Sequence, residues 1–291
     1  QVMPTGPVTP GKAWVEMVHR YLAMGVGVLI TVLAIAAWLG RKSKDGRAVM
    51  NPWWAAATLV WVCIQGAFGA LTVTMKLFPA IVTLHLLGGY VLLALLTVQS
   101  VMLAQQQGVG PPISTVSVRL RLAVFLALAL LTLQAASGAW VSTNYAVLAC
   151  TEFPQCQGSW WPQMDFSHGF EIWRHLGFGQ DGEHISFQSL TAIHFAHRLL
   201  AMFTLVLLAL LAAHLRSVPG LRKLARNLAV LLLLQLATGL SNVVLDWPLV
   251  AAVLHTGGAG ALIVVLVQAL VSTRVQRVGQ AHLANSTGLN A

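Results

Sequence analysis

Apolar residues gather along the chain in seven runs of about twenty, each separated from the next by a more polar segment. An α-helix rises 1.5 Å per residue, so a run of this length crosses the roughly 30 Å of hydrocarbon in a bilayer. One such run could be a buried helix of a soluble protein, but seven in series could not. The pattern therefore predicts an all-α membrane protein. The expected spans cover residues 15–39, 53–74, 80–104, 118–142, 188–214, 224–245 and 249–272.

Charged residues make up 9% of the 291 residues, well below the quarter or so that is usual in soluble proteins. Lys and Arg gather in alternate connections, and most acidic residues lie in the others. Because basic connections stay in the cytoplasm, we expect residue 1 outside a bacterial inner membrane and the tail after Thr273 inside. The net charge of +9 is then a topology signal, and no nucleic-acid partner is expected. The basic clusters are Arg41, Lys42, Lys44 and Arg47; Arg119 and Arg121; Arg216, Arg222, Lys223 and Arg226; and Arg274 and Arg277.

The two halves of the chain carry the same residue types at the same spacings, which indicates an internal repeat. A segment ending in His-Arg opens a span in each half, as EMVHR at 16–20 and as HFAHR at 194–198. In each half a Gln-x3-Gly element follows, with a histidine sixteen residues after its glycine and a further glycine three residues beyond the histidine. The repeat predicts two pseudo-symmetric four-helix bundles. The matched residues are Gln65, Gly69, His85 and Gly88, and Gln235, Gly239, His255 and Gly258.

A third Gln-x3-Gly element, from Gln134 to Gly138, lies on the span that opens the second half. The first half has no counterpart, so we expect a helix and an outer loop to precede Gln1 in the full protein. The long outer loop should form a partly ordered lid with a short helix before residue 188. The expected organisation is an N-terminal half-bundle at 1–105, a cytoplasmic linker at 106–117, a C-terminal four-helix bundle at 118–273 with its outer loop at 143–187, and a cytoplasmic tail at 274–291.

Two cysteines, Cys150 and Cys156, lie in the outer loop within the segment CTEFPQC. An extracytoplasmic location favours a disulfide between them. Two free thiols or a metal site are the alternatives, and no nearby CxxC or histidine spacing supports a metal.

Four of the ten histidines form two matching sets within the spans, His19 with His85 and His197 with His255. Ionisable residues inside a membrane are costly and usually functional. Imidazoles that face each other from two helices of a bundle are what six-coordinate haem iron needs. Zinc or copper would also accept imidazole, with Glu16 or His194 as a third ligand, and purely structural histidines are the remaining alternative. Because both sets lie near the outer end of their spans, a transbilayer electron pathway is disfavoured.

Flanking residues fit a flat macrocycle. Gly88 and Gly258 remove side-chain bulk one turn after a candidate ligand, where a haem ring would lie, although close helix packing is an equal explanation. Arg20 and Arg198 follow ligands near the outer surface and could pair with haem propionates, or else extend toward lipid headgroups.

With these helix starts, the CTEFPQC loop and the glycine-flanked histidines, the sequence resembles the haem A synthase family over nearly its whole length. The resemblance implies that His197 and His255 bind haem B in the C-terminal half. It also implies that His19 and His85 hold haem O, the substrate, in the N-terminal half. The implied reaction oxidises a porphyrin methyl to a formyl group by successive hydroxylations, giving haem A for cytochrome oxidase.

The resemblance further implies the lipid bilayer, haem O, haem O synthase, an electron donor such as a ferredoxin and the cytochrome oxidase assembly machinery as partners, with a homo-oligomer as an option. A haem carrier without chemistry and a b-type cytochrome that relays electrons are the competing functions. Product analysis separates them, because only a synthase makes a formyl porphyrin.

The repeat aligns Glu16 with His194, and here the two sites differ in chemical type. Each residue lies three positions before a candidate ligand and so shares that ligand's helix face. A carboxylate beside His19 could exchange protons or stabilise positive charge on a methyl group that is being oxidised. We therefore predict that Glu16 is catalytic, with a simple ion pair to Arg20 as the alternative.

Overall fold

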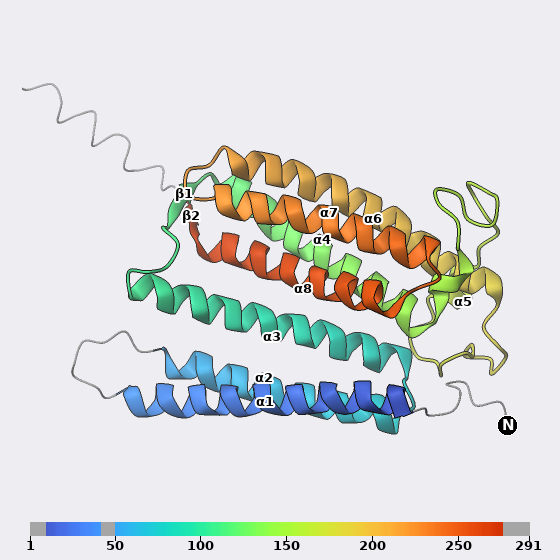
Figure 1. Cartoon of the computed structure of the whole chain (residues 1–291), viewed down its shortest axis with the longest axis horizontal. Helices are drawn as coiled ribbons and strands as arrows, with labels where there is room; N and C mark the ends of the chain where they lie inside the picture. Colours follow the sequence, from blue (N-terminus) through green and yellow to red (C-terminus); the bar gives the residue numbers. More distant parts are fainter. Residues whose placement is uncertain (1–9, 42–49, 276–291) are drawn as a thin grey trace, which may run out of the picture.

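The computed structural model describes residues 10–41 and 50–275. Within these residues, seven helices are long and apolar enough to cross a membrane, as the sequence pattern predicts. They lie nearly parallel in one layered stack (Figure 1). The long helices are α1 (Pro10–Gly40), α2 (Pro52–Thr74), α3 (Pro79–Gln106), α4 (Val118–Thr143), α6 (Phe187–Arg216), α7 (Arg222–Val244) and α8 (Leu249–Val271).

Helix starts are encoded locally. Proline occupies the first turn of α2 and α3, where its missing N–H is not needed. The side chains of Asn51, Ser117 and Ser186 accept hydrogen bonds from first-turn amides of α2, α4 and α6, which satisfies donors that the helix itself leaves unpaired. These signals place the long helices within a few residues of the predicted spans, and the all-α membrane class is confirmed.

Four helices of the second half close into a ring, in which α4 packs on α6 and α8, and α7 packs on the same two helices. In the first half, α1 packs on α2 and α2 on α3, while α3 also packs against α4 and α8. The largest buried apolar cluster fills the end of the ring remote from the long loop, with Val124, Leu208, Leu228 and Leu266 among its members. The histidine-bearing end is therefore not the packed core.

The end remote from the long loop carries a feature that the sequence did not indicate. Strand β1 (Ser114–Val116), within the predicted linker, pairs in parallel with β2 (Thr273–Val275) directly after α8. The Arg121 guanidinium donates to the Thr273 carbonyl at 2.7 Å, and the Ser114 hydroxyl donates to the Pro219 carbonyl at 2.9 Å. The linker is thus fastened to the end of α8 and to the α6–α7 connection.

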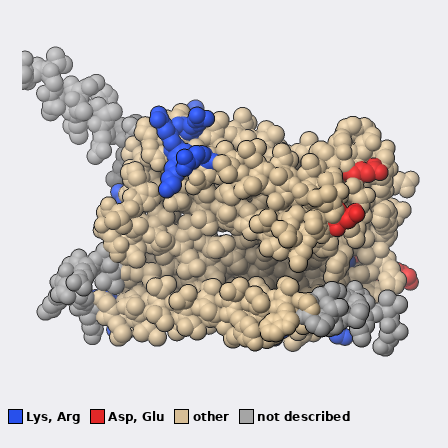
Figure 2. Space-filling model, viewed as in Figure 1, with Lys and Arg blue, Asp and Glu red and all other residues tan. Residues whose placement is uncertain are grey.

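Charge separates along the helix axis. On the face shown in Figure 2, most Lys and Arg side chains lie near the β1–β2 end and the Asp and Glu side chains near the opposite end. The same view is hollowed between the lower helix layer and the upper helices. Lys42, Lys44, Arg47 and Arg277 of the predicted basic clusters lie outside the described residues.

The long loop lies where α4 ends and α6 begins (Figure 1). It contains the 3-10 helix η1 (Ala146–Ala149) and the short helix α5 (Phe166–Gly169), so the expected helix before residue 188 is present. Cys150 and Cys156 form a disulfide and both are fully buried. The predicted pairing is confirmed.

The contact between α3 and α8 depends on Gly260. A Cβ atom there would lie 3.2 Å from Leu93 Cδ1 and 3.3 Å from Tyr90 Cε1, and the Tyr90 hydroxyl donates to the Thr256 carbonyl at 2.9 Å across the same interface. Small residues at helix crossings allow such close approach in membranes.

We expect Gly260→Val to lower the thermal unfolding temperature in detergent, because overpacking of this kind costs about 1–3 kcal/mol. Gly257→Val is the matched control, since it adds the same side chain to the same helix where no atom lies within 4 Å. Equal unfolding temperatures for the two variants would show that the α3–α8 contact is not tightly packed.

Candidate functional site

The four candidate histidines lie in the N-terminal half of α1, α3, α6 and α8. All four helices begin at the end of the molecule that carries the long loop (Figure 1). His85 lies close enough to His19, and His197 to His255, for their charges to interact. The structure thus brings together the two sets that the repeat predicts, although their role as iron ligands stays a prediction. His19 is exposed, whereas the other three are partly buried.

Each Gln-x3-Gly element frames one of these histidines from a neighbouring helix. The missing side chains of Gly69, Gly138 and Gly239 make room for imidazoles, because a Cβ atom there would lie 3.3, 2.9 and 3.1 Å from the Cε1 atoms of His85, His197 and His255, respectively. The glutamine of each element lies one turn earlier on the same helix. The glycine of each Gln-x3-Gly element therefore leaves room for an imidazole ring of the neighbouring helix, a role that the spacing alone did not reveal.

The glutamines explain the glycines that follow the histidines. A Cβ atom at Gly88 would overlap the Gln65 side-chain amide, and one at Gly258 would lie 2.6 Å from Gln235 Nε2. Gln65 and Gln235 are buried, and Gln235 donates to the His255 carbonyl at 2.8 Å. A glutamine that crosses from the adjacent helix therefore accounts for each glycine through close helix packing, and a role in clearing space for a haem ring stays a prediction.

Hydroxyl groups complete the frames in the second half. Ser137 Oγ lies 2.8 Å from His197 Nδ1, and Thr238 Oγ1 lies 3.0 Å from His255 Nδ1. A ring held through Nδ1 presents Nε2 for a bond to a metal, which is the usual arrangement of metal-binding histidines. Two such rings from facing helices fit the two axial positions of a haem iron.

Glu16 and His194 each accept a hydrogen bond from the arginine four residues later on the same helix. Glu16 accepts from the Arg20 guanidinium at 2.6 Å, with both side chains exposed. His194 Nε2 accepts from Arg198 Nε at 3.4 Å, and His194 is buried beside the backbone of Ala146 and Val147. Glu16 thus lies on the helix of His19 in an ion pair that an exposed site leaves weak.

Arg198 faces the disulfide loop. Its two terminal nitrogens donate to the carbonyls of Cys150, at 2.6 Å, and Gln155, at 3.1 Å. These contacts fasten the CTEFPQC segment to the helix of His197. The propionate role predicted for Arg20 and Arg198 stays a prediction, and in this structure both guanidinium groups are bonded within the protein.

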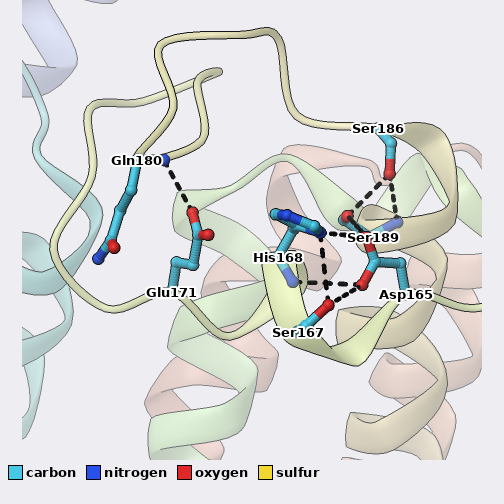
Figure 3. Close-up of polar contacts among 7 residues, drawn as sticks. All are labelled: Asp165, Ser167, His168, Glu171, Gln180, Ser186 and Ser189. Atoms are coloured by element: carbon cyan, nitrogen blue, oxygen red, sulfur yellow. Dashed lines mark hydrogen bonds and ion pairs between the residues drawn. The ribbon is translucent and has the colours of Figure 1, made fainter.

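The rest of the outer loop is held to the start of α6 by a polar cluster (Figure 3). Asp165 accepts from the Ser167 hydroxyl and from His168 Nδ1, both at 2.6 Å, and from the Ser189 hydroxyl at 3.4 Å. The hydrogen bonds from Ser167 and His168 hold the pKa of Asp165 well below its usual range, and Asp165 in turn raises the pKa of His168. The loop is thereby anchored to the first turn of α6, the helix that carries His197.

The alternative that the histidines bind zinc or copper requires a third protein ligand. Among residues 10–41 and 50–275, no three His, Cys, Asp or Glu side chains lie close enough to hold a metal ion together. Within that part of the chain, neither Glu16 nor His194 joins a histidine pair in such a cluster.

Sequence reasoning located the histidines but missed Ser137 and Thr238, which follow the glutamines by three residues. The signal was available in the comparison of QAASG with QLATG, where a hydroxyl residue precedes the glycine in both. The first half has QGAFG at this place, with Phe68 instead.

Comparison with known proteins agrees with this geometry. A family model described as "Cytochrome oxidase assembly protein" matches residues 3–267. The chain is 36% identical to the heme A synthase of Shewanella oneidensis over 274 residues, which is 91% of this chain and 78% of that protein. It is 27% identical to the heme A synthase of Halalkalibacterium halodurans over 259 residues, or 88% of this chain and 77% of that protein. The chain therefore belongs to the haem A synthase family of cytochrome oxidase assembly proteins.

Proposed function

We propose that this protein is a haem A synthase that oxidises a methyl group of haem O to the formyl group of haem A for cytochrome oxidase. The observation that carries the proposal is the pair of histidine sets, each drawn from two helices and both at the loop end, in a chain of this family. Two sets allow one haem to be a resident cofactor and the other to be the substrate. The family does not favour the carrier or the b-type cytochrome.

We assign haem B to His197 and His255, and haem O to His19 and His85. His197 and His255 lie on two helices of the closed ring of α4, α6, α7 and α8, and Arg198 fastens the disulfide loop to the helix of His197. Such enclosure suits a cofactor that stays bound. Nδ1 of His85 finds no hydrogen-bond partner among the described residues, and a less firmly held ligand suits a site where a substrate must enter and leave. When bound, the haems supply the redox chemistry, while the protein fixes their ligands and orientation.

The reaction hydroxylates the methyl group twice, and each hydroxylation replaces a C–H bond by C–OH in a two-electron oxidation whose electrons pass to an oxidant such as dioxygen. The resulting hydrate loses water to leave the formyl group. Each step consumes or releases protons near the reacting carbon. Glu16 lies on the helix of His19 and is the carboxylate nearest to it in sequence. We assign it proton transfer or stabilisation of developing positive charge, with Arg20 as its partner in the resting state.

The chemistry also requires partners. Haem O must arrive from the enzyme that makes it, electrons must come from a donor such as a ferredoxin, and haem A must pass to the oxidase assembly machinery. We place these exchanges at the first half, and a homo-oligomer would be compatible with them.

The purified protein should show a low-spin bis-histidine haem B spectrum. His255→Ala removes one axial ligand and should abolish or severely alter that spectrum, as measured by absorption and electron paramagnetic resonance. His184→Ala is a control, because this histidine lies in the outer loop, stacked on Phe178. An unchanged low-spin spectrum in His255→Ala would remove this residue from the ligand set.

Glu16→Gln in the full-length protein should retain the haem B spectrum but accumulate haem O or a hydroxylated product, seen by chromatography and mass spectrometry of extracted haem. The amide keeps the size of the side chain but cannot take up a proton at neutral pH. Arg20→Gln breaks the same ion pair and leaves the carboxylate in place, so it should retain more activity. A normal haem A yield from Glu16→Gln would contradict the assignment.

We further propose that the long loop lies outside the bacterial inner membrane and the C-terminus inside. The charge separation in Figure 2 supports this orientation. With Cys63 replaced by alanine, a membrane-impermeant thiol reagent should label Gln180→Cys, in the loop, in intact cells. Ser217→Cys, between α6 and α7, should react only after the membrane is opened. The reverse pattern would invert the topology.

A further inference from the structure

The two halves differ in how they hold the Nδ1 atom of their candidate ligands. In the second half, a hydroxyl lies 2.8 Å from Nδ1 of His197 and another lies 3.0 Å from Nδ1 of His255. In the first half, Nδ1 of His85 is buried without a hydrogen-bond partner among the described residues. The backbone of Gln65 lies near that ring, and Phe68 occupies the position of the hydroxyl residues.

The hydroxyl oxygens of Ser137 and Thr238 accept the hydrogen bond from the imidazole, because each hydroxyl hydrogen is donated elsewhere. A serine or threonine hydroxyl has one hydrogen to donate. Ser137 donates to the Gln134 carbonyl at 2.8 Å, and Thr238 donates to the Leu234 carbonyl at 2.8 Å. Each oxygen is then left to accept a hydrogen bond from Nδ1–H of the histidine. That bond fixes the tautomer in which Nε2 carries the lone pair needed to bind iron.

Gln134 also touches the His197 ring. Its Nε2 lies 3.1 Å from Nδ1, while its Oε1 is buried without a partner in the described structure. Nitrogen and oxygen of such an amide are assigned from their surroundings. Turning the amide over would place its unpartnered oxygen at Nδ1 as a second acceptor for the same proton, at the expense of the 3.4 Å hydrogen bond that Nε2 donates to the His197 carbonyl.

We propose that Ser137 and Thr238 are positioning residues that lock His197 and His255 as Nε2 ligands and so make the second site retain its haem, whereas Phe68 leaves His85 a looser ligand at a site that exchanges its haem. The inference rests on the proposed function and deepens it. A hydrogen bond to the distal nitrogen orients a metal-binding histidine and makes it a stronger electron donor, and its loss typically lowers metal affinity by about 10- to 100-fold.

The test compares haem release from the full-length haem-loaded protein to excess apomyoglobin. Thr238→Val keeps the side-chain shape and removes the hydroxyl, so haem B should leave about 10- to 100-fold faster. Ser137→Val should behave in the same way, and Ser137→Thr, which keeps the hydroxyl, should retain haem like the unchanged protein. The haem midpoint potential should also become more positive in both Val variants, because a weaker donor stabilises ferric iron less.

Matched controls lie on the same helices. Thr132 on α4 and Ser241 on α7 also donate to a carbonyl of their own helix at 2.8 Å. Thr132 is exposed and Ser241 is half-buried. Thr132→Val and Ser241→Ala should leave haem release and midpoint potential unchanged. If these controls release haem as fast as the Ser137 and Thr238 variants, the effect comes from the helices and the proposal is overturned.

The converse variant is Phe68→Ser, which offers His85 a hydroxyl at the matching register. In a His255→Ala background loaded with haem B as a probe, it should slow release from the first site by about tenfold or more. No change would overturn the assignment of Phe68.

The outcomes separate this inference from the proposed function. If His255→Ala leaves the low-spin spectrum intact, the ligand assignment itself fails. If His255→Ala removes that spectrum while Ser137→Val and Thr238→Val leave release and midpoint potential unchanged, only the positioning role fails.

Discussion

The structure depends on one constraint, the need to hold polar rings where little water is available to bond them. An imidazole inside a membrane span must find partners within the protein. The hydroxyl groups of Ser137 and Thr238 meet that need for His197 and His255. The glycines of three Gln-x3-Gly elements make room for the rings of His85, His197 and His255, and their glutamines cross to the neighbouring helix. The second glycine of each repeat, Gly88 or Gly258, then accommodates the crossing glutamine. The spacing of the repeat thus gives each candidate ligand a place for its ring between two helices.

The two halves of the chain differ in how their histidine side chains are held. The second half combines a closed helix ring, hydroxyl partners for both rings and a disulfide loop fastened by Arg198. In the first half, Nδ1 of His85 has no partner among the described residues, and Phe68 stands where the second half has a hydroxyl residue. Our account of a retained haem beside an exchangeable one depends on this contrast and not on the number of candidate iron ligands, which is two in each half.

Much of this could be predicted from the sequence, because the relevant physics is local or periodic. Span length follows from apolar runs, and the Cys150–Cys156 disulfide follows from a short separation in an outer loop. Apart from the two histidine sets, contacts between distant segments could not be predicted from the sequence. The β1–β2 pairing joins residues 114–116 to 273–275 through a backbone pattern that leaves no side-chain signature. The roles of Ser137, Thr238 and Gly88 depend on which helix face meets which neighbour, and the spacing of a single helix does not contain that information.

The most direct test of the account is the fate of haem O on the full-length protein. The membrane-embedded protein is loaded with haem O and supplied with reducing equivalents in air, and the haem is then extracted and analysed by chromatography and mass spectrometry. Our account predicts a hydroxymethyl derivative followed by haem A with its formyl group. Recovery of haem O unchanged, from protein whose haem B is bound and reducible, would contradict it and leave a binding protein without chemistry.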